Sequence, residues 1–349
     1  MAYTTINKST DYFNTKLYTG DGASSNAITG VGFQPDWNWH KIRNDTDWHM
    51  VNDAVRGANY TIYTNAPNGQ GNVPTGLKSF DSDGFTVGNL NDSNQNNGNF
   101  VSWNWKANGA GSANTDGDQS TTVSANTTSG FSIVKYTGTG TTTNFGHGLG
   151  TKPNVILIKS LSSNDWVMNG DFLGSTTWQH KIILNSTAAK ATANNFNDQA
   201  PTNSLFYLNS GHGTTNGSGT DYIAYCFADV PGYSKFGSYL GNSADDGTFV
   251  YTGFKPALIM VKRTNSTGNW VMHDNRRSLS NGFNVNQYIL HSNASTAEIT
   301  NESKVDLLSN GFKFRNAYTD QNANGSSYIF MAFAEAPLVG TNGVTAKAR

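Results

Sequence analysis

The chain has 349 residues and a formal net charge of −1, and 13% of its residues are charged, against about 25% in an ordinary globular protein. This balance provides no basic surface for nucleic acid or for an anionic membrane. No apolar run approaches the ~18 residues of a membrane span. Cys226, the single cysteine, excludes an internal disulfide.

The composition favours strands over helices. Gly is abundant at 37 residues, Asn, Ser and Thr dominate the polar positions, and Glu occurs only at Glu298, Glu302 and Glu335. Gly, Asn, Ser and Thr prefer turns, caps and strands to helices. Aromatic residues, at 12%, supply the large buried area that a sandwich core needs. The N-terminus lacks a charged and then apolar leader, so we expect no secretory signal.

A set of markers occurs three times in the same order, starting at Tyr18, Tyr136 and Tyr239. A repeat period of about 100 residues indicates three related units of about that size. After each tyrosine come a Gly-x-x-Pro segment, a lysine, a Trp-x-Met and an aspartate. The markers are Gly32 to Pro35, Gly150 to Pro153 and Gly253 to Pro256; Lys41, Lys159 and Lys262; Trp48, Trp166 and Trp270 with Met50, Met168 and Met272; and Asp53, Asp171 and Asp274.

Within each copy the strands are readable in chain order. Residues 131–136 alternate and end in a Thr-Gly turn, and residues 154–159 form a short apolar run that copy three repeats at 257–262. The closing strands, 101–105, 223–227 and 329–333, align with one large apolar face, made by Trp103 and Trp105, Tyr225 and Phe227, and Met331 and Phe333. The chain is therefore predicted to be all-β, with three tandem antiparallel β-sandwiches of jelly-roll or lectin-like type. Each is expected to bury its own aromatic centre.

The predicted boundaries follow composition. Repeat 1 covers residues 1–108, repeat 2 covers 131–229, repeat 3 covers 230–337, and 338–349 form a tail. Residues 109–130 are small and polar, which predicts a linker or an exposed hairpin.

Copy one departs from the other two on one strand. Asn38 and His40 stand where copy two has Ile156 and Ile158 and copy three has Ile259 and Val261. Two interpretations remain open: this face of copy one is wet or meets a partner, or the strand is an edge strand.

Catalytic and metal-binding patterns are thin. The seven histidines form no H-E-x-x-H motif and do not recur at repeat positions, so we predict no metal, no cofactor and no catalytic residue. The repeated Asp53, Asp171 and Asp274 are interpreted as turn or cap residues, with a repeated ligand contact as the alternative. Trp178 has no counterpart in the other copies and is the candidate for an exposed, ligand-stacking aromatic.

Several motifs together resemble a repeat domain of structural proteins in marine tailed bacteriophages, including those of cyanobacteria. They are Thr19-Gly-Asp-Gly22, Gly30-Val-Gly-Phe-Gln-Pro-Asp-Trp37, Ser82-Asp-Gly-Phe85, Ser102-Trp-Asn-Trp-Lys106, Gly148-Leu-Gly-Thr-Lys-Pro153, Asp221-Tyr-Ile-Ala-Tyr-Cys-Phe227, Gly232-Tyr-Ser-Lys-Phe-Gly237 and Tyr251-Thr-Gly-Phe-Lys-Pro256. The resemblance covers the chain from about Tyr12 to Pro337. It implies a virion component of the tail-fibre kind and carries over no catalytic residue.

The expected function is therefore a non-enzymatic virion structural protein of the tail or tail fibre that contributes to host attachment. Such a protein is made in the host cytoplasm, and its expected partners are other virion proteins, copies of itself and a host-surface glycan or protein. Neither nucleic acid nor membrane insertion is expected. The alternatives are a capsid decoration protein and a glycan-binding or glycan-degrading tail protein.

Overall fold

The computed structural model describes residues 4–277, 285–340 and 343. In these residues the chain is all-β, as predicted: several antiparallel sheets are joined by turns and by helical segments of only three or four residues. No helix of this described part is long and apolar enough to cross a membrane.

Repeat 1 has a main sheet of order β1-β9-β3-β4-β5-β6 and a small sheet of order β2-β8-β7. Its elements are β1 (Phe13–Thr19), β2 (Asn26–Thr29), β3 (Trp37–Ile42), β4 (Met50–Asp53), β5 (Tyr60–Tyr63), β6 (Gly71–Asn72), β7 (Leu77–Asp81), β8 (Gly84–Val87), α1 (Asn91–Asn94) and β9 (Asn99–Trp105), after a 3-10 turn at Ser9–Asp11.

Repeat 2 has a main sheet of order β10-β11-β12-β19-β14-β15-β16-β17 and a small sheet of β13 and β18. Its elements are β10 (Ser112–Asn114), β11 (Thr121–Asn126), β12 (Phe131–Thr137), β13 (Thr143–Gly146), β14 (Val155–Ser160), β15 (Val167–Gly170), a 3-10 turn (Asp171–Leu173), β16 (His180–Ile183), β17 (Ala191–Thr192), β18 (Leu205–Leu208), α2 (Gly213–Asn216) and β19 (Asp221–Phe227).

In repeat 3 the main and small sheets are continuous, in the order β20-β27-β22-β23-β24-β25-β26-β21. The elements are β20 (Ser234–Leu240), β21 (Phe249–Tyr251), β22 (Phe254–Arg263), β23 (Trp270–Asp274), β24 (Val285–His291), β25 (Ile299–Leu308), β26 (Gly311–Phe314), α3 (Thr319–Asn322) and β27 (Ser327–Pro337).

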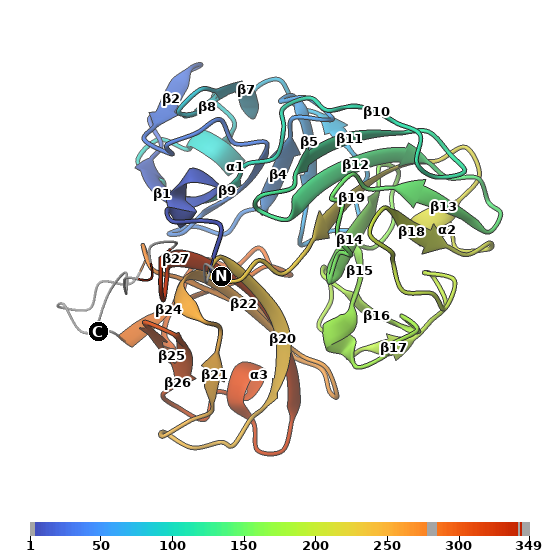
Figure 1. Ribbon diagram of the computed structural model, residues 1–349. Coiled ribbons are helices and arrows are strands. Elements are labelled where there is room, and N and C mark those ends of the chain that lie inside the picture. Colours follow the sequence, from blue (N-terminus) through green and yellow to red (C-terminus); the bar gives the residue numbers. More distant parts are fainter. Residues whose placement is uncertain (1–3, 278–284, 341–342, 344–349) are drawn as a thin grey trace.

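The three repeats share one strand order. Strands are counted from β1 in repeat 1, from β12 in repeat 2 and from β20 in repeat 3. The first strand then pairs with the last, the last with the third, the third with the fourth and the fourth with the fifth, and the one-turn helix comes directly before the last strand. The pairings Trp37↔Trp105, Val155↔Phe227 and Leu258↔Phe333 fix the equivalent positions. Figure 1 shows the repeats as three lobes around a common centre: blue to cyan above, green to yellow at the right, and orange to red below.

The apolar faces of the three main sheets meet in one central core. This overturns the expectation of a separate aromatic centre in each repeat. The ring of Trp37 in repeat 1 stacks on that of Tyr225 in repeat 2, with 4.6 Å between the ring centroids. The ring of Phe333 in repeat 3 packs edge-on to those of Trp105 and Phe227, with centroid distances of 5.4 and 5.9 Å. A single cluster of buried side chains contains residues of all three repeats. The strand alternation predicted the correct apolar face of each closing strand. That face packs against the other two repeats and not inside a separate core of its own repeat.

The opposite face of each main sheet packs under the small sheet of its own repeat. Three smaller clusters of buried side chains lie there, one to a repeat. They centre on Phe85 in repeat 1, Phe206 in repeat 2 and Phe312 in repeat 3. Each main sheet therefore stands between the shared core and a private core.

The interfaces between repeats are equivalent and close a ring. In each, a backbone N–H in the loop after the third strand donates to a carbonyl that follows the fifth strand of the neighbouring repeat. A second N–H, three residues beyond that carbonyl, donates back. The first bonds are Asn164 to Pro67 (2.8 Å), Gly268 to Thr187 (2.9 Å) and Asp47 to Ser295 (2.9 Å); the second are Gln70 to Leu161 (2.8 Å), Lys190 to Thr264 (3.0 Å) and Glu298 to Arg43 (2.7 Å).

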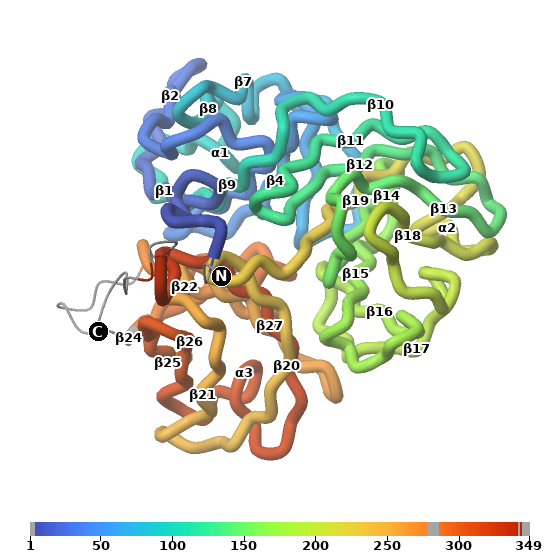
Figure 2. The backbone as a smooth tube through the Cα atoms, viewed as in Figure 1, coloured from blue at the N-terminus to red at the C-terminus, as the bar shows by residue number. Residues whose placement is uncertain are grey.

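This ring is a head-to-tail arrangement inside one chain. Repeat 2 docks on repeat 1, repeat 3 on repeat 2, and repeat 1 on repeat 3, so each repeat uses the same two surfaces. Heterologous contacts of this kind form a closed ring when the rotation between units fits. The tube in Figure 2 shows the chain passing once through each lobe, with its described N-terminal part at the centre.

The predicted linker or hairpin at 109–130 contains two strands. β11 pairs with β12 and β10 pairs with β11, which extends the sheet of repeat 2. Gln119 also bridges Phe145 in parallel, so this segment runs along the edge of β13 as well.

Candidate functional site

The three repeat-matched lysines lie at the interfaces of the ring. Lys41, Lys159 and Lys262 are fully buried. Lys159 Nζ donates to the carbonyls of Ser160 (2.7 Å) and Ser162 (3.2 Å) and, across the interface, to that of Pro67 (3.3 Å). Lys262 Nζ likewise donates to the backbone carbonyl of Thr187 across the next interface, at 3.2 Å. Lys41 Nζ donates to the backbone carbonyl of Asp45, within its own repeat, at 3.0 Å. Burial lowers the pKa of all three lysines to about 8.

The repeat-matched tryptophans also cross the interfaces. Trp166 Nε1 donates to the Tyr63 carbonyl of repeat 1 at 2.8 Å, and Trp270 Nε1 donates to the Ile183 carbonyl of repeat 2 at 2.9 Å. Both indoles are buried in the shared core. They tie each repeat to its neighbour and are not available to a ligand.

In repeat 1 the equivalent of these tryptophans is His49, so the predicted match of Trp48 is wrong by one residue. The pairings of Val51 and Met168 with the third strand set the register, and two residues earlier stand His49 and Trp166. His49 is buried and accepts a hydrogen bond from Trp39 Nε1 at 3.0 Å. The loop before this position is one residue shorter in repeat 2, and this difference gave Trp48 its apparent match.

Two of the repeated aspartates form buried ion pairs that also reach a neighbouring repeat. Asp53 binds Arg56 at 2.5 Å and accepts a hydrogen bond from Tyr225 of repeat 2 at 2.7 Å. Asp274 binds Arg277 at 2.5 Å and accepts from Trp103 Nε1 of repeat 1 at 3.0 Å. Burial alone would raise the pKa of Asp274, but the charge and hydrogen bonds of Arg277 hold it below its ordinary value. Both carboxylates are occupied by these contacts.

Asp171 does not belong to this set. The position equivalent to Asp53 is Gly170, because both pair with the start of the third strand. Asp171 begins a 3-10 turn and is bound by Lys152 at 2.9 Å and by Trp178 Nε1 at 2.9 Å. In repeat 3 the residue equivalent to the donors Tyr225 and Trp103 is Met331, which has no hydrogen-bond donor in its side chain.

Trp178 is buried, which overturns its selection as an exposed aromatic. Its ring packs edge-on to Phe196 at 5.5 Å in the private core of repeat 2, and its backbone has a positive φ of 55°. A tryptophan without a counterpart in the other repeats is therefore a core residue of a repeat-specific loop.

Asn38 and His40 are also buried, so neither of the two open interpretations holds. β3 has a strand on each side, and both side chains have no exposed surface. Asn38 donates to Asn104 Oδ1 at 2.8 Å, and its own oxygen lies 2.6 Å from His40 Nδ1. The ring of His40 stacks on Phe85 of the small sheet. Burial lowers the pKa of His40 to about 3, so the imidazole is neutral.

One asparagine in each repeat forms a structural motif that the sequence reasoning missed. Asn94, Asn216 and Asn322 end the one-turn helices and are buried, and their Oδ1 atoms accept N–H groups just after the first strand. The three marker tyrosines donate to the carbonyl immediately before each asparagine, at 2.7–2.8 Å. A signal was present: an Asn stands a few residues before a Gly ahead of each closing strand, at Asn94, Asn216 and Asn322.

An exposed aromatic beside two carboxyl groups is the best-formed candidate for ligand binding. Trp48 is 39% exposed and its ring packs on Tyr63 at 5.1 Å. Burial, and then the hydrogen bond and charge of Asp47, raise the pKa of Asp92 to about 7. The raised pKa lets the Asp92 carboxyl keep its proton to near neutral pH beside Asp47. Sequence reasoning missed this pair because Asp47 lies in the β3–β4 loop and Asp92 in α1, far apart in the sequence.

This carboxyl pair does not have the geometry of a two-carboxylate glycosidase. Such enzymes hold their carboxyl groups about 5–9.5 Å apart on either side of the bond they cleave. Asp47 and Asp92 are hydrogen-bonded to each other and are therefore closer than that. The arrangement suits hydrogen bonding to a hydroxyl-rich ligand beside an aromatic ring.

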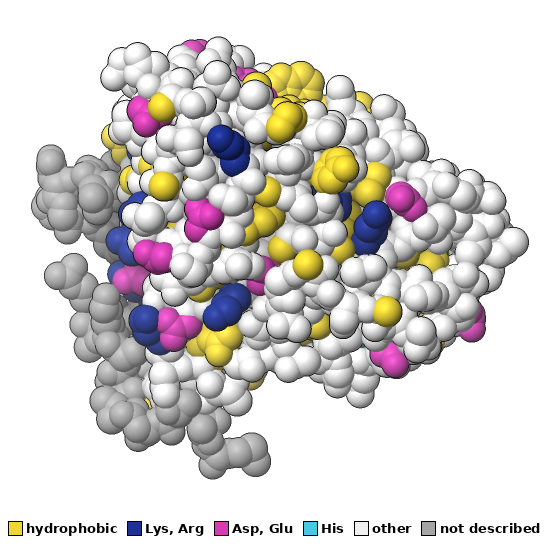
Figure 3. All heavy atoms as spheres, turned by 90° about the horizontal axis from the view of Figure 1, so that it is seen from above, with side chains coloured by type: hydrophobic (Ala, Val, Ile, Leu, Met, Phe, Trp, Pro, Cys, Tyr) yellow, Lys and Arg dark blue, Asp and Glu magenta, His cyan; other side chains and the backbone are white. Residues whose placement is uncertain are grey.

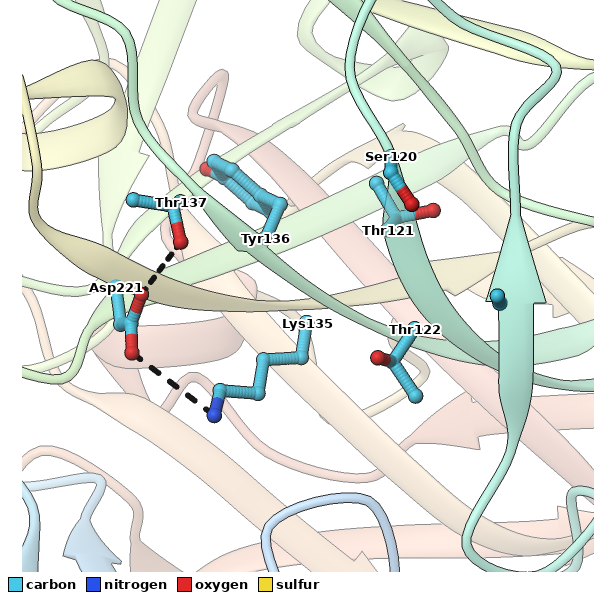
Figure 4. Close-up of a pocket in the computed structure, with 8 residues that line it drawn as sticks. Ser120, Thr121, Thr122, Lys135, Tyr136, Thr137 and Asp221 are labelled. Atoms are coloured by element: carbon cyan, nitrogen blue, oxygen red, sulfur yellow. Dashed lines mark hydrogen bonds and ion pairs between the residues drawn. The ribbon is translucent and has the colours of Figure 1, made fainter.

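Two surface hollows lie on repeat 2. The hollow in Figure 4, of about 260 Å³, is lined by hydroxyl groups of β11 and β12 and by an ion pair. In it Asp221 accepts a hydrogen bond from Thr137 at 2.7 Å and lies 3.9 Å from Lys135 Nζ. The second, of about 440 Å³, lies between Lys152, Asp171 and Gly174–Thr176. Each contains one carboxylate, already paired with a lysine.

Figure 3 shows one face, which is mostly neutral polar and backbone atoms. Apolar side chains appear across its middle, and Lys or Arg side chains lie beside Asp or Glu side chains toward its left edge. Among the described residues, no group of three or more His, Cys, Asp or Glu side chains is placed to hold a metal ion.

No curated protein and no solved structure is significantly similar to this chain. A family model described as a domain of unknown function, DUF7483, matches residues 8–337. That match takes in all three repeats and the whole ring, so the chain belongs to the DUF7483 family.

Proposed function

We propose that this protein is a non-enzymatic structural component of a bacteriophage virion, in the tail or tail fibre, that contributes to attachment to the host surface. The observation that carries the proposal is the set of equivalent interfaces in the ring. The three repeat-matched lysines, two of the tryptophans (Trp166 and Trp270) and two of the aspartates (Asp53 and Asp274) are buried in the core and at the interfaces, where they hold the molecule together. The resemblance of the repeat motifs to marine phage structural proteins supports the same role.

The mechanism suited to this architecture is rigid presentation of loops. The three main sheets share one interior, so the loops at the rim of each lobe are held in fixed relative positions. Copies in an oligomer then sum weak contacts into avidity. Loops carry recognition more readily than the repeated strands.

Immunogold labelling of phage particles tests this role. We expect an antibody against the protein to label the tail. Label confined to the capsid shell would contradict the tail assignment and favour a decoration protein. Particles without any label would contradict the virion assignment altogether.

A second candidate function, glycan binding, is favoured by the Trp48 site. An exposed indole packed on Tyr63 offers an aromatic platform, and Asp47 and Asp92 offer hydrogen-bond partners for hydroxyl groups. We expect Trp48→Ala to weaken binding of host-envelope polysaccharide, while Tyr60→Ala, at another exposed aromatic of repeat 1, leaves it unchanged. Release of reducing sugar that Asp92→Asn abolishes would instead show a hydrolase and overturn the non-enzymatic proposal.

A further inference from the structure

The small sheet of repeat 3 ends in a strand that has only one neighbour. β21 pairs with β26 and is the last strand in the order of its sheet. Among the described residues, no segment pairs with its other edge. The equivalent strand of repeat 2, β13, is covered there: Gln119 bridges Phe145, and Asp118 and Asn144 exchange hydrogen bonds. This edge thus accepts a further segment in one repeat and is open in another.

The open edge carries exposed aromatic side chains. Phe249 is 43% and Tyr251 56% exposed, and Leu240, whose carbonyl accepts a hydrogen bond from Thr248, is 62% exposed. The register with the adjacent strand makes Ala27 and Thr29 the equivalents in repeat 1. Edge strands are commonly protected by charged residues or proline. β21 has neither.

The backbone of β21 presents its free groups at two residues. Thr252 N–H donates to Asn310 on the β26 side at 2.9 Å. Backbone groups alternate between the two edges of a strand, so Val250 also faces β26. The N–H and C=O groups of Phe249 and Tyr251 then point to the open edge.

The segment around β21 reads the same in both directions. Gly247-Thr-Phe-Val-Tyr-Thr-Gly253 is a palindrome about Val250 in which Phe and Tyr exchange places. An antiparallel pair of two such strands, related by a twofold axis at Val250, sets Phe249 of each copy opposite Tyr251 of the other.

We propose that the open edge of β21 is a homodimer contact, and that its occupant is β21 of a second copy of this chain. The pairing uses the free backbone groups of Phe249 and Tyr251 and places aromatic side chains in direct cross-strand contact, a favourable arrangement on a sheet face. It joins two small sheets into one sheet across the twofold axis. The contact is short, so the dimer forms reversibly with concentration. It does not depend on the proposed virion role.

Cysteine cross-linking tests the register directly. Opposite residues in a hydrogen-bonded antiparallel pair have Cα atoms about 5.5 Å apart, which a disulfide spans. Residue 249 of one copy and residue 249 of the other lie on a diagonal, about 7–8 Å apart, which it does not. Cys226 is buried and does not interfere. We expect a mixture of Phe249→Cys and Tyr251→Cys proteins to form a disulfide-linked dimer under mild oxidation, several times more than either variant alone.

Sedimentation equilibrium of the full chain provides the second measurement. We expect a monomer–dimer equilibrium that Phe249→Lys weakens at least about tenfold, since charge on an edge opposes strand pairing. Ala27→Lys, at the equivalent exposed position of repeat 1, is the matched control and is expected to leave the equilibrium unchanged. Circular dichroism establishes that both variants are folded.

Three results would overturn the proposal. They are a chain that remains monomeric at the highest concentrations, a dimer that Phe249→Lys does not weaken, and equal cross-linking in the mixed and the single-variant samples. The last two would indicate that another surface holds the copies together.

Discussion

At the scale of single residues, several buried polar side chains are hydrogen-bonded or ion-paired to one another within a sheet or across an interface. Asn38 and His40 form such a layer in repeat 1, where the other repeats have aliphatic side chains. Tyr225 connects the Asp53–Arg56 pair to repeat 2. Buried polar groups are costly when left without partners, so each of these contacts has a measurable effect on stability.

The neutral state of His40 predicts acid sensitivity. Its pKa is about 3 in the folded protein and about 6.5 in an unfolded chain, so between these values the unfolded chain binds the additional proton. Stability from this residue is therefore present above pH 6.5 and is lost as the pH falls toward 3. At pH 5 the expected loss is about 2 kcal/mol, at about 1.36 kcal/mol per pH unit.

His40→Val removes this titration. We expect the fall in the free energy of unfolding between pH 7 and pH 5, measured by urea denaturation at each pH, to be smaller by about 2 kcal/mol in the variant. His212→Gln, at a more exposed histidine, is the control and is expected to change the pH dependence less. An unchanged slope in His40→Val would show that His40 is not neutral in the folded protein.

Tyr225→Phe tests the link between repeats 1 and 2. The hydroxyl donates to a buried carboxylate at 2.7 Å, and hydrogen bonds to charged groups contribute about 1.5–3 kcal/mol. We expect a loss of that size in the free energy of unfolding. Tyr60→Phe, at a 39% exposed side chain, is expected to change it by less than about 0.5 kcal/mol. Equal effects of the two substitutions would contradict the role given to Tyr225.

At the scale of elements, the loops after the third and fifth strands make the interfaces. At the contact of repeats 1 and 2 the fit is close: a Cβ added at Gly69 would lie 2.8 Å from the Leu161 oxygen and 3.0 Å from the Ser162 carbonyl carbon. The equivalent residues at the other two interfaces are Ala189 and Ala297. Those two interfaces accommodate a Cβ at this position, whereas the contact of repeats 1 and 2 has no room for one.

Gly69→Ala is expected to destabilise the protein by about 1–3 kcal/mol, because a backbone has to move to make room. Gly213→Ala is the control, since no atom lies within 4 Å of an added Cβ and the backbone there has an ordinary φ. Thermal unfolding of both variants measures the effect. Loss of stability in Gly213→Ala alone would contradict the interface geometry.

The sequence predicted the strands better than the surfaces against which they pack. The alternation at Trp103 and Trp105 identified the apolar face of a closing strand, because strand periodicity is local. It could not show that this face packs against repeats 2 and 3, since one residue pattern serves a private and a shared core equally well. The carboxyl groups of Asp47 and Asp92 likewise meet only when the β3–β4 loop folds against α1.

Repeat matching by letters also failed where loop lengths differ. Trp48 aligns with Trp166 in the sequence, but the strand pairing places His49 there, and Asp171 stands one residue after the position of Asp53. Register is set by backbone pairing and by which side chains reach the core. A difference of one residue in loop length is enough to align a residue with the wrong structural position in another repeat.

At the scale of the whole molecule, the three repeats form one cooperative unit. Every main sheet has one face in the shared core, and the repeats are joined in a ring by equivalent hydrogen bonds. Removing one repeat would expose the apolar faces of the other two. The interface of repeats 3 and 1 has no chain connection, and there Glu298 binds both Arg43 (2.8 Å) and Arg277 (3.1 Å).

Differential scanning calorimetry tests the shared core most directly. Independent sandwich domains would unfold separately, whereas units that share one interior unfold together. We predict one transition for the full chain, with the calorimetric enthalpy equal to the van't Hoff enthalpy, and we predict that Gly69→Ala shifts this single transition as a whole. Two or three resolved transitions, only one of which moves in the variant, would contradict the account.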